Sequence, residues 1–292
     1  MRGIIIGNIS NLYQVKVDNK VIECNARGKM KQEDELSPVV GDNVEIELLE
    51  NENKGVINKV FDRKTYCKRP KIANLSQIIL VVSLKNPKPD LLLLDKQLAY
   101  SEYLNIEPII CLNKTDIGKK DELENIHNVY EKIGYKVIDT IAKENVGVDK
   151  IKKLLKNNIT AFSGNSGVGK STLINCLFED SNAIEGEIST KNKKGKNTTT
   201  STFLYEIDNG YIADTPGFST FTIEEIESKE LAHYFRDFSK YLDKCEYGDC
   251  NHIKEENCGI KNALEEGKID SGRYERYCKI CEELKDKEDH KW

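Results

Sequence analysis

The sequence predicts three consecutive parts: an N-terminal β-barrel, a central α/β domain and a C-terminal helical segment with a Cys/His cluster. Short alternating strands occupy residues 1–68, buried strands alternate with helices over 73–221, and charged helical stretches occupy 222–292. A chain of 292 residues is long enough for two or three modules. The fold class is therefore multidomain.

Charge and composition predict a soluble protein. The net charge is -5, from 44 Lys and Arg against 49 Asp and Glu, so binding to nucleic acid would need local patches. Two basic runs could serve, although the pattern of each, taken alone, is more typical of a solvated loop. They are Arg63, Lys64, Lys68, Arg69 and Lys71, then Lys191, Lys193, Lys194 and Lys196. No apolar run approaches the roughly 20 residues that span a bilayer. We expect a cytoplasmic monomer without a membrane partner.

The N-terminal part reads as five short strands separated by turns that contain Asn, Asp or Gly. A small barrel of the OB type fits five such strands, and a small sandwich is the alternative. The strands are Gly3–Gly7, Leu12–Val17, Val21–Cys24, Val44–Leu49 and Gly55–Val60.

The central part has the alternating pattern of a doubly wound α/β domain. The continuous apolar run Ile78–Ser83 predicts a strand buried on both faces. The predicted strands are Ile78–Ser83, Pro108–Leu112, Val137–Thr140 and Ile159–Ser163, with a hairpin of Phe203–Ile207 and Tyr211–Asp214. The predicted helices are Leu91–Leu104, Asp121–Ile133, Gly147–Leu155 and Ser171–Phe178, followed in the C-terminal part by Ile223–Tyr241, Cys258–Glu266 and Ser271–Asp286.

A glycine-rich turn between a strand and a helix fits the phosphate-loop pattern G-x-x-x-x-G-K-[ST]. Its residues are Gly164, Asn165, Ser166, Gly167, Val168, Gly169, Lys170 and Ser171, directly after Ser163. The glycines let successive N–H groups converge on phosphate oxygens, and the helix N-terminus favours the negative charge. Lys170 should reach the β- and γ-phosphates and Ser171 should ligate Mg²⁺. The loop predicts a nucleoside triphosphate without specifying the base.

A second motif selects the base. Asn113, Lys114, Thr115 and Asp116 follow the strand that ends at Leu112. The Asp116 carboxylate can accept from both N1–H and the N2 amino group of guanine, whereas adenine presents an acceptor at N1. A site built for such paired polar groups can reject the analogue that lacks them by roughly 10⁴-fold or more. Residues 140–143 lie where GTPases often carry a Ser-Ala-Lys turn; Ile141 departs from that pattern, but Ala142, whose N–H would meet guanine O6, is kept. The sequence therefore predicts GTP and GDP as ligands.

A third motif, Asp214-Thr215-Pro216-Gly217, fits the γ-phosphate sensor D-x-x-G. Asp214 should hold Mg²⁺, and the Gly217 N–H should meet the γ-phosphate. One threonine of the upstream loop, Thr198 or Thr199, is the expected switch-I ligand of Mg²⁺. Ras-like enzymes place a water-orienting Gln just after D-x-x-G. Here that residue is Phe218, which predicts slow hydrolysis without a partner.

The order of these motifs is circularly permuted, because the guanine motif precedes the phosphate loop. Together with a barrel before and a Cys/His cluster after, this order resembles the bacterial ribosome small-subunit-dependent GTPases, a circularly permuted ribosome-biogenesis family. The resemblance covers nearly the whole chain. It implies a GTPase that is stimulated by the small ribosomal subunit, acts in late maturation of that subunit, and contacts rRNA through its barrel and zinc domains. The family usually has a His in switch I where this chain has Asn197, so a His-based mechanism does not carry over.

The C-terminal cluster has the composition of a structural zinc site. Cys245, Cys250, His252 and Cys258 supply three thiolates and one imidazole within a short segment, a closed set that leaves no position for substrate. With nine cysteines, an odd number, metal binding and buried thiols are favoured over disulfides. Cys278 and Cys281 share one helix face and are interpreted as core residues, and the remaining cysteines as small buried hydrophobes: Cys24, Cys67, Cys111 and Cys176.

Two other function classes remain open on the residues alone. A metabolic P-loop kinase or ATPase would use ATP, against which Asp116 argues. A zinc-bearing binding module would bind GTP without turnover.

Overall fold

The computed structural model describes residues 1–9, 12–28, 37–49, 53–179, 202–214, 223 and 225–290, and the structural statements below concern these residues. They form two compact units. The first contains the described parts of Met1–Ile78, Asn145–Phe162 and Ser171–Ser219, and the second those of Ile79–Glu144, Ser163–Lys170 and Thr220–Trp292. Each unit is therefore assembled from three separate stretches of sequence.

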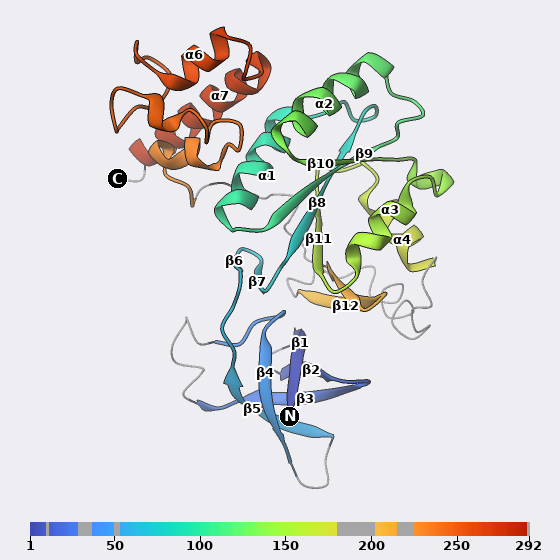
Figure 1. Ribbon diagram of the computed structural model, residues 1–292. Coiled ribbons are helices and arrows are strands. Elements are labelled where there is room, and N and C mark those ends of the chain that lie inside the picture. Colours follow the sequence, from blue (N-terminus) through green and yellow to red (C-terminus); the bar gives the residue numbers. More distant parts are fainter. Residues whose placement is uncertain are drawn as a thin grey trace. The chain divides into compact units, whose positions relative to one another are not determined.

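A five-stranded barrel occupies the N-terminal part of the first unit (Figure 1). Its strands pair in the order β1-β2-β3-β5-β4, and an additional pairing of β1 with β4 closes the ring. The strands are β1 (Arg2–Ile9), β2 (Leu12–Val17), β3 (Lys20–Ala26), β4 (Asn43–Leu48) and β5 (Lys54–Val60). Alternate residues such as Val15, Ile46 and Ile57 fill the interior and are 0–2% exposed. Ring closure removes the sheet edges, which confirms a barrel over a sandwich.

The rest of the first unit continues from the barrel. The hairpin of β12 (Phe203–Ile207) and β13 (Gly210–Asp214) joins β1 through the pair Gly7 and Phe203, and β13 pairs in parallel with β11 (Ile159–Ser163). Helix α3 (Val148–Leu155) packs on β13, and α4 (Lys170–Glu179) follows the phosphate loop. A short hairpin of β6 (Tyr66–Lys68) and β7 (Lys71–Ala73) comes after the barrel. Sequence periodicity did not predict it, because each strand has only three residues.

The second unit is built on parallel strands. Strand β8 (Gln77–Ser83) begins in the first unit and continues here beside β9 (Glu107–Asn113), which pairs in parallel with β10 (Lys136–Thr140). Every residue of β8 is buried, as the continuous apolar run predicted. Helix α1 (Leu91–Tyr103) packs on β9, α2 (Lys120–Ile133) packs on β10, and the short turn η2 (Ala142–Glu144) follows β10.

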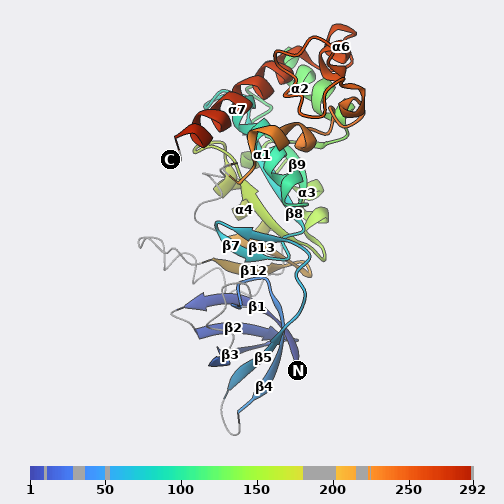
Figure 2. The same cartoon turned by 90° about the vertical axis from the view of Figure 1, so that its left-hand side faces the viewer.

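The C-terminal residues of the second unit pack against α1 (Figures 1 and 2). They contain the 3₁₀ turns η4 (Ser228–Tyr234) and η5 (Leu242–Lys244) and the helices α6 (Gly259–Glu265) and α7 (Ser271–Asp289). The predicted helix over Ile223–Tyr241 was wrong: its described part contains η4 and turns. Phe235 and Phe238 pack on Tyr277, while Arg236 and Asp237 pair with α1 and α7 respectively, so tertiary contacts overrode helical spacing.

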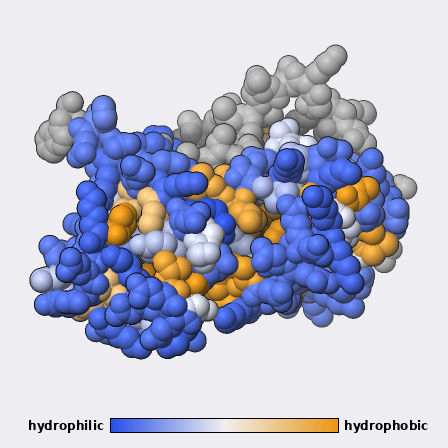
Figure 3. Space-filling model, turned by 90° about the horizontal axis from the view of Figure 1, so that it is seen from above, coloured by the Kyte–Doolittle hydropathy of each residue, from blue (hydrophilic) through white to orange (hydrophobic). Residues whose placement is uncertain are grey.

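Seen from above, the described surface is mostly hydrophilic, with apolar areas between the hydrophilic ones (Figure 3). This agrees with a sequence in which 32% of residues are charged. Within the part of the chain that the structure describes, no helix combines the length and apolarity needed to cross a membrane.

Candidate nucleotide site and metal centre

The phosphate loop has a backbone path that only glycine allows at its key positions. Gly164, Gly167 and Gly169 have φ angles of 136°, 79° and 102°, in the left-handed region that other residues rarely adopt. A Cβ at Gly164 would lie 2.2 Å from the Val81 carbonyl oxygen, and one at Gly169 would lie 2.3 Å from Asn113 Nδ2. The loop can therefore approach β8 and the guanine motif closely only because Gly164 and Gly169 have no Cβ.

Lys170 folds back over the loop that precedes it. Its Nζ donates to the carbonyl oxygen of Gly164 at 2.6 Å and to that of Asn165 at 2.8 Å. Burial lowers the pKa of Lys170, since desolvation penalises the charged form. The amine thus lies against the backbone of the loop for which the sequence predicts contacts with phosphate oxygens.

The guanine motif is tied directly to the phosphate loop. Asn113 is 2% exposed and its Nδ2 donates to the Val168 carbonyl oxygen at 2.9 Å. Its Oδ1 accepts from Thr140 Oγ1 and from the Ala142 N–H, each at 3.1 Å. Asn113 therefore holds three segments together: the end of β9, the loop after β10 and the phosphate loop.

Lys114 makes the second link between the two motifs. Its Nζ donates to the Gly167 carbonyl oxygen at 2.7 Å and to that of Asn86. Its backbone has a φ of 61°, a left-handed conformation that turns the chain sharply after β9. Because of this turn, the Lys114 stem crosses from the guanine motif to the phosphate loop.

Asp116 is exposed, and among the described residues it makes no hydrogen bond or ion pair. Its carboxylate is available for a ligand. Thr115 Oγ1 donates to the Thr140 carbonyl oxygen at 3.4 Å, and the Ala142 N–H, predicted to meet guanine O6, donates here to Asn113. Asn113 and Thr115 are thus anchored on β10 and Lys114 on the phosphate loop, whereas Asp116 is left exposed.

The predicted Mg²⁺ ligands are partly described. Ser171 is exposed in the first turn of α4, and Asp214 is exposed as the last residue of β13. Because β13 is parallel to β11, both strands end at the same edge of their sheet. Asn197, Thr198, Thr199, Gly217 and Phe218 lie outside the described residues.

Helix α1 and its N-cap make two contacts, one with the phosphate loop and one with the residue just before it, that the sequence analysis missed. Asp90, which precedes α1, accepts from Asn165 Nδ2 at 3.0 Å. Gln97 Nε2 donates to Ser163 Oγ at 2.8 Å, and both side chains are buried. The Asp after Pro89 is a recognisable helix N-cap, so its place at a helix start could have been predicted from the sequence. Its contact with the loop could not.

The four predicted metal ligands come together. Their donor atoms all lie within 4.8 Å of one another, with His252 Nδ1 at 3.4 Å from the sulfurs of both Cys245 and Cys258. Tetrahedral ligands at 2.0–2.3 Å from Zn²⁺ would be separated by roughly 3.3–3.8 Å, so the donor set fits this ion with little movement. Burial raises the pKa of the Cys250 thiol to about 12. A cation is therefore needed to keep a thiolate there near neutral pH.

The cluster is supported by α7 and by its own backbone. Tyr274 Oη donates to the His252 carbonyl oxygen at 2.7 Å, and Tyr277 Oη donates to that of Asn251 at 3.0 Å. Although burial would raise it, hydrogen bonds from backbone N–H groups of the cluster loop lower the pKa of Glu255 to about 2. Cys278 is partly exposed and Cys281 is buried. Cys176, predicted to be buried, is half-buried.

Comparison with known proteins agrees with this geometry. Residues 60–224 match the family model described as RsgA GTPase, and residues 2–57 match that of the RsgA N-terminal domain. The chain belongs to the RsgA GTPase family. Membership confirms the predicted family, the GTPase class of enzyme, and the order of barrel, GTPase domain and Cys/His cluster.

Curated members of the family match along their whole length. The chain is 42% identical over 294 residues to the "Small ribosomal subunit biogenesis GTPase RsgA" of Clostridium botulinum (strain Kyoto / Type A2), with all of both chains covered. It is 43% identical over 293 residues to the protein of the same name from Clostridium beijerinckii (strain ATCC 51743 / NCIMB 8052), again with both chains covered entirely.

Two solved structures are similar over nearly the whole chain. YjeQ from Thermotoga maritima has a TM-score of 0.83 at 36% identity, with 97% of this chain and 98% of that chain covered. YloQ, described as a circularly permuted GTPase, has a TM-score of 0.82 at 32% identity, with 98% and 95% covered. The permuted order of motifs is thus a property of the fold, as the sequence predicted.

Proposed function

We propose that one guanine nucleotide binds across the two linked motifs and is hydrolysed there. The observation that carries this proposal is the pair of links from Asn113 and Lys114 to the phosphate loop, at 2.9 and 2.7 Å. They fix the base-reading and phosphate-binding residues in one unit. The Asp116 carboxylate selects guanine, and the loop N–H groups with Lys170 bind the phosphates. An ATP-dependent kinase would not need the exposed Asp116 carboxylate, because adenine presents an acceptor at N1.

The chain's own residues also set the rate of hydrolysis. Ser171, Thr199 and Asp214 are the residues that would hold Mg²⁺, whose chemistry when bound is to neutralise charge on the β- and γ-phosphates. The Gly217 N–H would bind the γ-phosphate. Asn197 can orient a water molecule by hydrogen bonding but cannot remove its proton near neutral pH. With Phe218 at the position of the Ras-like Gln, the isolated chain should be slow, so a partner has to complete the site.

We further propose that this partner is the small ribosomal subunit, and that the chain assists its late maturation in the cytoplasm. The curated relatives carry the words "small ribosomal subunit biogenesis" in their name. The barrel and the zinc-binding segment would contact rRNA. Support comes from the β6–β7 hairpin, where the cations Lys68, Arg69 and Lys71 are exposed. In the cluster loop, Tyr247 is 55% exposed and offers a ring on which a base can stack.

The metal at the Cys/His cluster would be structural. Cys245, Cys250, His252 and Cys258 would complete a tetrahedral set around Zn²⁺, which leaves no position for water or substrate. Its role would be to hold the loop that carries Tyr247.

Multiple-turnover GTP hydrolysis, measured with and without purified small ribosomal subunits, tests this function. We expect slow turnover alone and a rise of at least tenfold with small subunits. Large subunits serve as the matched control and should have little effect. An unchanged rate with small subunits would refute the ribosomal role. If the protein bound GTP but hydrolysed none under any condition, the proposed GTPase activity would fail and the protein would be a GTP-binding module.

A further inference from the structure

A single carboxylate ties the phosphate loop to helix α1. Asp90 Oδ1 accepts from the Leu93 N–H at 2.9 Å and so caps the helix. Asp90 Oδ2 accepts from Asn165 Nδ2 at 3.0 Å. Asn165 is the first residue after Gly164 in the loop. The start of α1 and the start of the loop are therefore fixed to the same side chain.

The same face of α1 stays against the loop for two turns. Residues 90, 94 and 97 share this face by their helical spacing. Leu94 is 1% exposed, and Gln97 reaches Ser163 as described above. The cavity between helix and loop is only about 10 Å³, roughly the space of one water molecule. Little room remains for the loop to shift unless α1 shifts with it.

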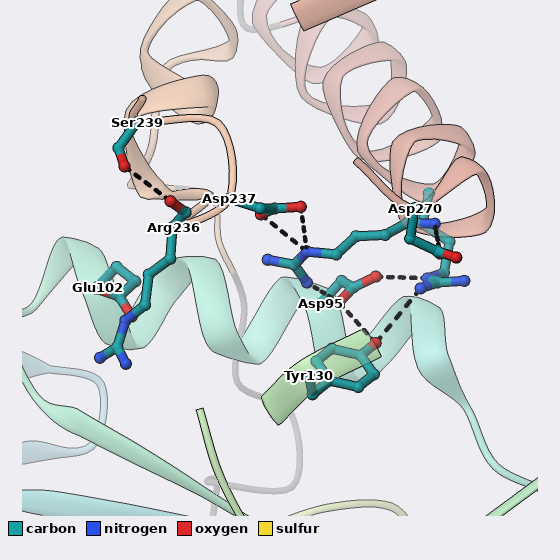
Figure 4. Close-up of polar contacts among 9 residues, drawn as sticks. Asp95, Glu102, Tyr130, Arg236, Asp237, Ser239 and Asp270 are labelled. Atoms are coloured by element: carbon teal, nitrogen blue, oxygen red, sulfur yellow. Dashed lines mark hydrogen bonds and ion pairs between the residues drawn. The ribbon is translucent and has the colours of Figure 1, made fainter. Parts of the chain in front are cut away.

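The opposite side of α1 is bound to the C-terminal residues by buried charges (Figure 4). Asp95, which is 0% exposed, pairs with both Arg273 and Arg276 of α7 and accepts from Tyr130 Oη at 2.9 Å. Arg273 is also 0% exposed, and its Nε donates to Asp237 at 3.1 Å. We call residues 225–238, which include η4, together with α7 the docking segment.

Three further contacts lie along the same helix. Tyr100 Oη donates to Glu225 at 3.1 Å, Lys96 pairs with Glu283 at 2.5 Å, and Glu102 pairs with Arg236 at 2.5 Å. Breaking a buried ion pair on one side leaves an uncompensated charge, so Asp95 and Arg273 strongly favour one position of α1 on the docking segment. The helix is held rigidly on one side and holds the loop on the other.

We propose that Asp90 is a positioning residue for the phosphate loop, and that α1 transmits the position of the docking segment to that loop. The proposal rests on the nucleotide site proposed above. Asp90 touches no phosphate. It orients Asn165 and thereby the loop N–H groups that would bind phosphates. A partner that displaces the docking segment would move α1 and loosen the loop, which changes affinity for GTP and GDP alike.

The first test replaces Asp90 by Ser, which keeps a good N-cap but is too short to reach Asn165. Asp270→Ser is the matched control, because Asp270 caps α7 in the same way, at 2.8 Å from the Arg273 N–H, and does not contact the loop. We expect Asp90→Ser to lower the affinity for GTP and for GDP about fivefold each, the ratio typical of one lost hydrogen bond. The kcat for bound GTP should be nearly unchanged. Asp270→Ser should bind like the wild type.

A double-mutant cycle separates this role from a merely structural one. Asn165→Ala should weaken nucleotide binding by at least as much as Asp90→Ser, and the double variant should bind no more weakly than Asn165→Ala alone. Additive losses, or an Asp90→Ser protein with wild-type affinity, would overturn the proposal. If the wild-type chain itself bound no guanine nucleotide, the proposed function would fail instead, so the two failures are distinguishable.

Hydrogen–deuterium exchange of the full chain tests the transmission. Asp237→Asn weakens the docking segment at Arg273, and Tyr100→Phe removes only the hydroxyl that reaches Glu225. Both should raise exchange in peptides that cover residues 163–170. Glu265→Gln, an exposed change on α6, is the control and should not. Exchange in 163–170 that stays at the wild-type level in both test variants would refute the role of α1.

Discussion

Asn113→Ala is the substitution whose effect on the nucleotide site follows most directly from the structure. The Asn113 side chain makes three hydrogen bonds, to the Val168 carbonyl oxygen, Thr140 Oγ1 and the Ala142 N–H, at 2.9–3.1 Å. It is 2% exposed, so water cannot easily replace these partners. Truncation would leave one backbone carbonyl and one N–H without their partner.

The expected loss can be worked from these contacts. A net contribution of about 1 kcal/mol for each hydrogen bond gives a loss of about 3 kcal/mol in the free energy of unfolding. A change of this size lowers the melting temperature by roughly 6–12 °C in a unit of 150–250 residues. GTP affinity should fall at least about tenfold, since the phosphate loop loses its anchor at Val168.

Calorimetric melting and equilibrium titration with a fluorescent GTP analogue would measure both effects. Asn128→Ala, an exposed change on α2, is the matched control and should leave stability within about 0.5 kcal/mol of the wild type. The reasoning would be refuted by an Asn113→Ala protein as stable as the Asn128→Ala protein. It would also be refuted if stability fell while affinity for GTP stayed unchanged.

Three further predictions concern the second unit. Metal chelation, or Cys258→Ser, should unfold residues 245–258, which faster hydrogen exchange there would show. GTP affinity should stay within about twofold of the wild type, because Arg273 and not the cluster holds α1. Equal loss of structure and of GTP affinity would contradict this. Arg273→Met should cost about 3–5 kcal/mol in denaturant titration by leaving Asp95 and Asp237 buried with too few partners, and Arg276→Met should cost less. Burial would lower the pKa of His127, but hydrogen bonds to Asp139 and Glu131 raise it overall. The stabilisation of the fold by His127, under about 1 kcal/mol, should therefore be complete below pH 6.5 and be lost as the pH rises through the folded-state pKa. A stability difference between wild type and His127→Gln that does not change with pH would count against this.

The nucleotide motifs could be predicted from the sequence because their chemistry is local. Gly164–Ser171 and Asn113–Asp116 each carry their function within a few consecutive residues, and each follows a strand that the sequence predicted, β11 and β9 respectively. The barrel strands were predictable for a related reason, since alternation of buried and exposed residues is a property of each strand alone.

Contacts between distant segments could not be predicted. The sequence indicated Arg63 as part of a basic patch, but its guanidinium binds both oxygens of the buried Asp42 at 2.8 Å, so it stabilises the fold instead. Similarly, nothing local to Asp95 indicates that it pairs with two arginines that lie 178 and 181 positions away. Such partners are set by tertiary packing, which periodicity does not report.

Base selectivity of the Asp116→Asn protein is the measurement that tests most directly whether the Asp116 carboxylate selects guanine. Competition among GTP, ATP and xanthosine triphosphate should show strong preference for GTP in the wild type. In the variant, the amide should favour xanthosine triphosphate, whose extra carbonyl accepts from it, while stability stays unchanged because Asp116 is exposed. A variant that still prefers GTP as strongly as the wild type would show that this carboxylate does not read the base.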